Sequence, residues 1–280
     1  MNETPNATER DYWSGPSGQT WIRHREDQDA ILAQVTDLVV ARAEAKPGQG
    51  AVDIGCGTGA LTRAMADRVG AAGTVLATDI SAPLLAETER LSAGAPQVTP
   101  LLADAQSVDW PGEPLDMAVS RFGVMFFSDP PKAFANIGRA LKPGGRMVFA
   151  AWGAYSENPF WVVPQRIAAE RLGRPPAIPA TEPGPFGLSD RDWSMTQLEE
   201  AGLDDVACER ASVGLRHPGG LEALSELSTR IGPAARVLRL FAGTEDDRLA
   251  VRDDILQSFR DMAEDDAVPA LIHLFTATRR

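Results

Sequence analysis

A glycine-rich turn between two apolar runs constrains this chain most. The run Ala51–Ile54 leads directly into Gly55-Cys56-Gly57-Thr58-Gly59, and a second apolar run ends in Asp79. Glycines let the backbone approach a ligand closely, and a carboxylate about 20 residues after the last glycine is placed to bind ribose hydroxyls. The sequence therefore predicts an α/β domain that holds an adenosine-containing ligand at the carboxyl ends of its strands.

Acidic residues near the turn indicate which adenosine ligand fits. Asp53 stands just before the first glycine, where a carboxylate would repel the pyrophosphate of a dinucleotide, because pyrophosphate binds backbone N–H groups and helix N-termini. S-adenosylmethionine has an ammonium group, a sulfonium group and no phosphate, so it tolerates that carboxylate. Asp104 and Ala105 follow a third apolar run, residues 98–103, and are placed to contact the adenine amino group.

Five segments resemble the motifs of class I S-adenosylmethionine-dependent methyltransferases, in the family's order. They are residues 52–59, Asp79, Asp104-Ala105, residues 115–119 and residues 141–149, all within residues 50–152. The stretch Ser120–Phe127 is similar to the branch of ubiquinone and menaquinone C-methyltransferases. The chain departs from that branch after residue 153, so the resemblance leaves the acceptor open.

The resemblance also implies roles around the cofactor, S-adenosyl-L-methionine, which leaves as S-adenosyl-L-homocysteine. Gly55 and Gly57 would allow the close backbone approach, Asp53 would neighbour the methionine ammonium, and Asp79 would bind the ribose hydroxyls. The adenine contacts and the surroundings of the methionyl part match five further residues: Ile80, Asp104, Ala105, Arg121 and Phe122. Plainer explanations stay open, since glycines also serve packing, Asp104 could cap a turn and Arg121 could pair with an acid.

Aromatic residues outside these segments are candidates for the pocket walls. Trp13 and Trp21 lie in a polar N-terminal segment whose Tyr-Trp, Gly and Trp pattern resembles the start of the same branch. They either fold over the pocket, with Trp21 at the cofactor and Trp13 toward the acceptor, or anchor the first helix on the sheet. Further candidates on the acceptor side are Trp152, Tyr155, Phe160, Trp161 and His217. No residue stands out as a general base.

Strands and helices alternate along the chain. Apolar periodicity predicts helices near 19–45, 58–69, 83–92 and 131–141, and strands near 51–54, 74–79, 98–103, 115–119 and 146–152. A helix to about residue 172, one over 189–201 and helices within 219–264 are expected beyond them, with strands near 204–213 and 270–278. The pattern implies a Rossmann-like, doubly wound, mostly parallel seven-stranded α/β sheet with an N-terminal helix, helical lid insertions and an antiparallel last strand at its far side.

The expected organisation is a single methyltransferase domain over residues 1–280. Its predicted parts are an N-terminal helical cap (1–48), a cofactor-binding core (49–152), a lid insertion (153–190), a helical insertion (219–264) and the last strand (266–280). The lid is indicated by a Pro- and Gly-rich run, 174–187, that is long for an ordinary connection.

Charge and composition narrow the range of partners. The formal net charge is −12 over 280 residues, and no basic stripe is visible, which disfavours nucleic acid and anionic membranes. The two cysteines and three histidines show no metal-binding spacing. No signal peptide and no membrane span is recognisable, so a cytoplasmic protein is expected.

The leading functional hypothesis is methyl transfer to oxygen, nitrogen or an activated carbon of a small, partly apolar acceptor. Three alternatives stay open: another S-adenosylmethionine enzyme of aminopropyl or cyclopropane-forming type, a cofactor-binding regulatory protein without catalysis, and an NAD(P) oxidoreductase. The apolar faces of the late helices could pack against the core or against a second subunit, which leaves a homodimer open.

Overall fold

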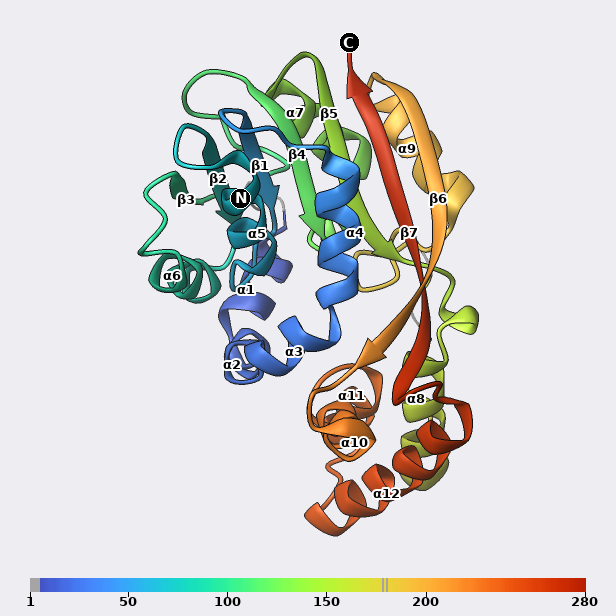
Figure 1. The fold of residues 1–280 in the computed structure, drawn as a ribbon. Coiled ribbons are helices and arrows are strands. Elements are labelled where there is room, and N and C mark those ends of the chain that lie inside the picture. The colour runs from blue at the N-terminus through green and yellow to red at the C-terminus, as the bar shows by residue number, and fades with distance from the viewer. Residues whose placement is uncertain (1–5, 178, 180) are drawn as a thin grey trace.

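A seven-stranded sheet forms the centre of the molecule (Figure 1). The computed structural model describes residues 6–177, 179 and 181–280. The strands lie in the order β3-β2-β1-β4-β5-β7-β6. Their bounds are β1 Gly50–Ile54, β2 Thr74–Asp79, β3 Val98–Leu102, β4 Leu115–Arg121, β5 Leu141–Trp152, β6 Leu203–Arg216 and β7 Ala267–Arg279.

The pairing confirms the predicted fold class. β1 to β5 pair in parallel, whereas β7 is antiparallel to both of its neighbours, β5 and β6. The prediction of an antiparallel last strand is therefore correct, and β7 lies one place in from the edge because β6 covers its outer side. The carboxyl ends of β1, β2 and β4 meet at one edge of the sheet, where ligands bind in open α/β folds.

Helices cover both faces of the sheet. α4 (Ala33–Ala43) and α5 (Ala60–Val69) lie on the near face in Figure 1, and α7 (Pro130–Arg139) and α9 (Arg191–Glu200) lie on the far face. α6 (Ala82–Leu91) packs beside β2 and β3. Stacked rings join the far face to the strands: Phe134 lies 5.4 Å from Phe149, and Phe149 lies 4.9 Å from Phe275, centroid to centroid.

The N-terminal region is a chain of short helices instead of the one long helix predicted over 19–45. α1 (Ala7–Ser14), α2 (Pro16–Arg23) and α3 (Arg25–Ile31) precede α4, with breaks at Gly15, His24 and Leu32. We call α1 to α4 the N-terminal cap. Gly18 leaves no room for a side chain, because an added Cβ would lie 1.8 Å from the carbonyl oxygen of Trp13. The backbones of α1 and α2 are therefore in direct contact at this position.

Four further helices form a lobe below the carboxyl edge of the sheet in Figure 1. These are α8 (Pro159–Leu172), α10 (Gly220–Arg230), α11 (Pro233–Leu240) and α12 (Glu245–Met262). We call them the helical lobe. Leu221, Leu224 and Leu227 of α10 and Ile255 and Phe259 of α12 are buried, as their helical spacing predicts.

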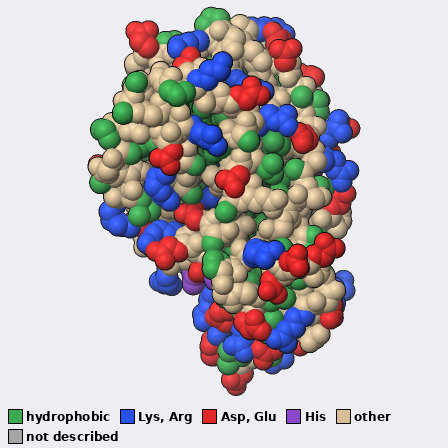
Figure 2. All heavy atoms as spheres, in the orientation of Figure 1, with side chains coloured by type: hydrophobic (Ala, Val, Ile, Leu, Met, Phe, Trp, Pro, Cys, Tyr) green, Lys and Arg blue, Asp and Glu red, His purple; other side chains and the backbone are tan. Residues whose placement is uncertain are grey.

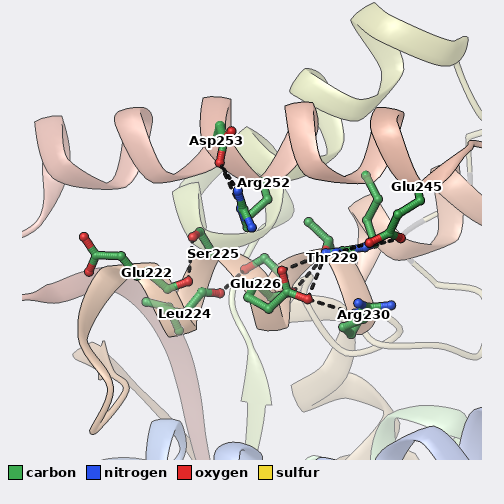
Figure 3. A network of polar contacts seen from close by, with 11 residues as sticks. Glu222, Leu224, Ser225, Glu226, Thr229, Arg230, Glu245, Arg252 and Asp253 are labelled. Carbon is green, nitrogen blue, oxygen red and sulfur yellow. Dashed lines mark hydrogen bonds and ion pairs between the residues drawn. The ribbon is translucent and has the colours of Figure 1, made fainter.

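Charged contacts hold the outer side of this lobe together. Glu226 of α10 accepts hydrogen bonds from Arg230, at 3.0 Å, and from Arg248 of α12, at 2.7 Å, and Arg248 also binds Glu245. Figure 3 shows Glu226 between Thr229 and Arg230, with Glu245 reaching in from the neighbouring helix. On the face seen in Figure 2, acidic and basic side chains intermingle over the lobe.

No helix in the described part of the chain is both long and apolar enough to cross a membrane.

Candidate functional site

A cavity of about 1510 Å³ lies at the carboxyl edge of the sheet. Its walls come from the glycine-rich loop, from the ends of β2, β4 and β5, from the N-terminal cap and from the helical lobe. All the predicted cofactor residues line it: Asp53, Gly55, Gly57, Asp79, Ile80, Asp104, Ala105, Arg121, Phe122 and Trp21. Of the predicted acceptor-side residues, it is lined by Trp13, Trp152, Tyr155 and Trp161.

The glycine-rich loop needs its glycines for two different reasons. Gly55, Gly57 and Gly59 all have positive φ, at 65°, 58° and 81°, a conformation that costs residues with a side chain about 1 kcal/mol or more. A Cβ on Gly55 would also lie 2.7 Å from the Cα of Gly123. At Gly57, by contrast, the nearest atom to an added Cβ is the Trp21 indole nitrogen, at 3.9 Å, so this backbone faces the cavity.

Asp79 closes the loop from the neighbouring strand. Its carboxylate accepts hydrogen bonds from the backbone N–H of Gly57 and of Ser81, both at 2.8 Å. Burial raises the pKa of Asp79 to about 6, against the pull of these backbone donors. Since a carboxylate has about four acceptor positions, two remain for hydroxyl groups of a ligand.

Asp53 leaves one oxygen without a partner. Its Oδ2 accepts a hydrogen bond from the Thr62 hydroxyl at 2.6 Å, and its Oδ1 is buried without a partner among the described residues. The hydroxyls of Thr58 and Thr78, which also line the cavity, are buried and unpaired in the same way. Burial raises the pKa of Asp53 to about 7. Unsatisfied buried polar atoms gathered at one site indicate that a polar ligand completes it.

Asn6, the residue just before α1, holds the Asp104 carboxylate. The side-chain amide of Asn6 donates to both carboxylate oxygens of Asp104, at 3.0 Å each, while its oxygen accepts from the backbone N–H of Ser128. Gln106 donates its backbone N–H to Asp104 at 2.9 Å. The start of the N-terminal cap is thereby fastened to the acid predicted to meet the adenine.

Arg121 joins the sheet to the N-terminal cap. Its guanidinium donates to the hydroxyl of Thr36 at 2.9 Å and pairs with Asp29 of α3 at 3.1 Å. Asp29 also pairs with Arg63, which donates to the carbonyl of Thr58 in the glycine-rich loop. The arginine at the end of β4 therefore both lines the cavity and pairs with an acid.

The backbone is strained where β4 enters the cavity. Phe122 has a φ of 65°, which is uncommon for a bulky residue and concentrates at functional sites. Its ring stacks on Trp152, with centroids 4.2 Å apart and planes 9° from parallel, and Trp152 meets the edge of Trp161 at 5.2 Å. These three rings form an aromatic wall between the glycine-rich loop and the helical lobe.

Trp13 and Trp21 pack together over the other side of the cavity. Their ring centroids are 5.8 Å apart, and Trp13 also contacts Phe126 at 5.4 Å. The hydroxyl of Ser81 donates to the carbonyl of Trp13 at 2.9 Å. Both indoles therefore cover the cavity, and they also hold α1 and α2 against the end of β2.

Two predicted acceptor-side residues do not line the cavity. Phe160 is 2% exposed and stacks on Phe259 at 5.9 Å, because its side of α8 faces the interior of the helical lobe. His217 donates from Nε2 to Asp27 at 3.1 Å and accepts the backbone N–H of Gly219 at Nδ1. These bonds turn its ring toward α3, so the prediction for both residues is corrected.

Several residues that matter to the cavity carry no recognisable signal in the sequence. Asn6 and Asp29 lie in polar stretches without a motif, and their roles depend on the path of the N-terminal cap. Five arginines that line the cavity come from the helical lobe and the loop after α8: Arg166, Arg174, Arg230, Arg236 and Arg239. In the sequence, these arginines look like the solvent-exposed residues of an ordinary surface helix. Only the tertiary structure shows that they line the cavity. Among the described residues, no cluster of three or more potential metal ligands occurs.

Comparison with known proteins agrees with this geometry. A family model described as a methyltransferase domain matches residues 51–145. The ubiquinone/menaquinone biosynthesis C-methyltransferase UbiE of Burkholderia vietnamiensis is 31% identical over 190 residues, covering 64% of this chain and 76% of its own. The enzyme of the same name from Paraburkholderia phymatum is 30% identical over 190 residues, with the same coverage.

Solved structures share the fold. YcgJ from Bacillus has a TM-score of 0.53 at 15% identity, covering 89% of this chain and 99% of its own. The phosphoethanolamine N-methyltransferase 2 of Haemonchus contortus, solved in complex with S-adenosyl-L-methionine, has a TM-score of 0.57 at 17% identity, covering 96% and 59%. At these identities the likeness concerns the fold alone.

Sheet order, glycine-rich loop and strand-end carboxylates together define a Rossmann-like methyltransferase that uses S-adenosylmethionine. Within that class, the chain belongs to the S-adenosylmethionine-dependent methyltransferase family, in the branch that includes the ubiquinone/menaquinone C-methyltransferases.

Proposed function

We propose that this methyltransferase acts on oxygen, nitrogen or an activated carbon of a small, partly apolar acceptor. The observation that carries the proposal is one continuous cavity, which extends from the glycine-rich loop past the aromatic wall of Phe122, Trp152 and Trp161 into the helical lobe. Flat apolar walls suit an aromatic or unsaturated acceptor. A net charge of −12 argues against a nucleic-acid acceptor.

In this proposal the residues divide the cavity between cofactor and acceptor. Asp53 supplies its unpaired oxygen to the ammonium group, Asp79 supplies its free lone pairs to the ribose, and Asp104 with Ala105 faces the adenine. Ile80 and Trp21 pack on the cofactor, with Arg121 and Phe122 at its methionyl end. The unpaired buried oxygen of Asp53 supports this fit, since a cation is its natural partner.

Bound S-adenosylmethionine supplies an activated methyl group on a sulfonium. The chain's own part is to align the acceptor and to exclude water. The rings of Phe122 and Trp152 shape the passage between the two halves of the cavity. No general base is assigned: burial raises the pKa of Tyr155 to about 12, and its hydroxyl donates to the side chain of Gln165. The proposed mechanism therefore works by positioning.

Incubation with radiolabelled S-adenosylmethionine and a panel of quinols, phenols, amines and thiols tests the proposal. Label should pass to at least one acceptor class, and preferentially to compact aromatic members. A protein that binds the cofactor tightly yet labels no acceptor of the panel would contradict it.

The two buried carboxyls predict an opposite effect of pH on binding and on stability. The pKa is about 7 for Asp53 and about 6 for Asp79, against an ordinary value of 3.8, so affinity for S-adenosylhomocysteine should rise as pH increases through 6 to 7. For the free protein the sign is reversed. The contribution of Asp53 and Asp79 to the free energy of unfolding is fully present below their ordinary pKa of 3.8, and it is lost as pH rises through their folded pKa values of about 7 and about 6.

Calorimetry at pH 6 in buffers of different ionisation enthalpy should show proton release on binding. Thr62→Val removes the hydroxyl that favours the ionised form of Asp53, so the rise in affinity should move to higher pH. An affinity that does not change between about pH 5 and 8 would contradict the assignment of the ammonium group to Asp53.

A further inference from the structure

The acceptor end of the cavity gathers basic side chains in an acidic protein. Arg166 of α8, Arg174 after it, Arg230 at the end of α10, and Arg236 and Arg239 of α11 all line the same cavity. The chain as a whole carries a net charge of −12. A local excess of cations against that background creates a positive potential where the walls are apolar.

Two of these arginines are already neutralised. Arg166 pairs with Glu170 at 3.1 Å, and Arg230 pairs with Glu226 at 3.0 Å (Figure 3). Arg174, Arg236 and Arg239 form no ion pair and no side-chain hydrogen bond with the described residues. Their charges are therefore available to a ligand.

The acids at this end do not cancel the three free charges. Besides Glu170, the cavity is lined here by Glu182 and Asp190. The Asp190 carboxylate caps α9 by accepting the backbone N–H of Trp193 at 3.0 Å. Both Glu182 and Asp190 keep their negative charge, so two carboxylates stand against three unpaired guanidinium groups at this end of the cavity.

Packing places these arginines beyond the aromatic wall, as seen from the glycine-rich loop. At the start of α11, a Cβ on Gly232 would lie 2.4 Å from the Trp161 ring, so this end of the helix touches the wall. Just past its other end, Phe241 lies 2.9 Å from where a Cβ of Gly173 would stand, which places Arg174 beside it. Arg236 and Arg239 are three residues apart and share one face of α11.

We infer that the acceptor carries an anionic group, a carboxylate or a phosphate, bound by Arg174, Arg236 and Arg239. Its apolar body then lies against Trp152 and Trp161, with the methylated atom toward the glycine-rich loop. Guanidinium groups bind such oxyanions through paired, charge-assisted hydrogen bonds. The inference rests on the proposed function, since it assigns the helical-lobe end of the cavity to the acceptor.

Binding of matched probes tests this inference without turnover. Protein saturated with S-adenosylhomocysteine is titrated with phenyl phosphate, benzoate and phenol, and binding is followed by calorimetry. Wild type should prefer at least one anionic probe over phenol by about tenfold or more, and added salt should reduce the preference. Comparing phenyl phosphate with benzoate shows which oxyanion the site takes.

Arg236→Gln combined with Arg239→Gln should remove most of the preference while leaving phenol binding unchanged. Arg174→Gln should reduce the preference further in the same direction. Arg252→Gln is the matched control, because Arg252 pairs with Asp253 on α12 and does not line the cavity. Circular dichroism of each variant confirms that the helical lobe is folded.

The outcomes separate this inference from the proposed function. Equal affinity for all three probes, absence of any probe binding, or an equal loss in the Arg252 variant would overturn the anionic acceptor. Failure of wild type to bind S-adenosylhomocysteine would instead overturn the assignment of the cofactor half of the cavity.

Discussion

Replacement of Asp79 by alanine is expected to weaken binding of S-adenosylmethionine by about a hundredfold or more. In the proposed binding mode the carboxylate accepts two charge-assisted hydrogen bonds from the ribose hydroxyls, each contributing about 1.5–3 kcal/mol, and about 3 kcal/mol corresponds to a hundredfold in affinity. The substitution also removes the acceptors of the Gly57 and Ser81 N–H groups. Calorimetric titration of wild type and variant measures the effect.

A matched control separates loss of the contact from loss of charge. Asp67 is exposed on α5, outside the cavity, so Asp67→Ala should leave the affinity unchanged. Comparing adenosine with adenine isolates the ribose: the gain in affinity that the ribose provides in wild type should vanish in Asp79→Ala. A variant that retains this gain would show that Asp79 does not bind the ribose.

Gly123→Ala is expected to destabilise the protein by about 2–4 kcal/mol, because it pushes two backbone segments apart. An added Cβ would lie 2.4 Å from the carbonyl oxygen of Ile54 and 2.8 Å from the Cα of Gly55. The φ of Gly123 is −81°, which alanine adopts freely, so the cost is steric. Because the clash falls on the glycine-rich loop, cofactor affinity should decline as well.

Urea denaturation followed by circular dichroism measures the stability change. Gly94→Ala is the control, since a Cβ there meets nothing within 4 Å and its φ is outside the left-handed region. That variant should unfold within about 0.5 kcal/mol of wild type. If both glycine variants had the same stability, the close approach of β1 and the turn after β4 would not be as tight as described.

The cofactor half of the cavity was predictable because its signals are local. Asp53 and Asp79 lie at the carboxyl ends of β1 and β2, and the glycines follow β1 directly. Parallel strands bring their carboxyl ends to one edge of the sheet. The sequence pattern thus predicts the placement of these residues without knowledge of the packing. Their ligand contacts remain predictions that the Asp79 and pH experiments test.

Other features depend on tertiary packing and left no such signal. The breaks at His24 and Leu32 carry no Gly or Pro, and they occur where the N-terminal cap turns around the cavity. Helical spacing predicts that Phe160 is buried. It does not predict whether its side of α8 faces the cavity or the interior of the helical lobe. His217 lies in a turn whose direction is set by Asp27, a distant residue in sequence. The unpaired arginines of α11 have the sequence pattern of a solvent-exposed helix face. They line the cavity only because α11 packs against α8.

The topology of the last two strands has a consequence for evolution and engineering. Arg216 and Ala267 face each other at the end of the β6–β7 ladder, so residues 217–266 leave the sheet and return to it at one point. This stretch contains Arg236 and Arg239 and none of the predicted cofactor residues. Its length and sequence can therefore vary without any change in strand order, provided that α11 and α12 keep their packing against α8.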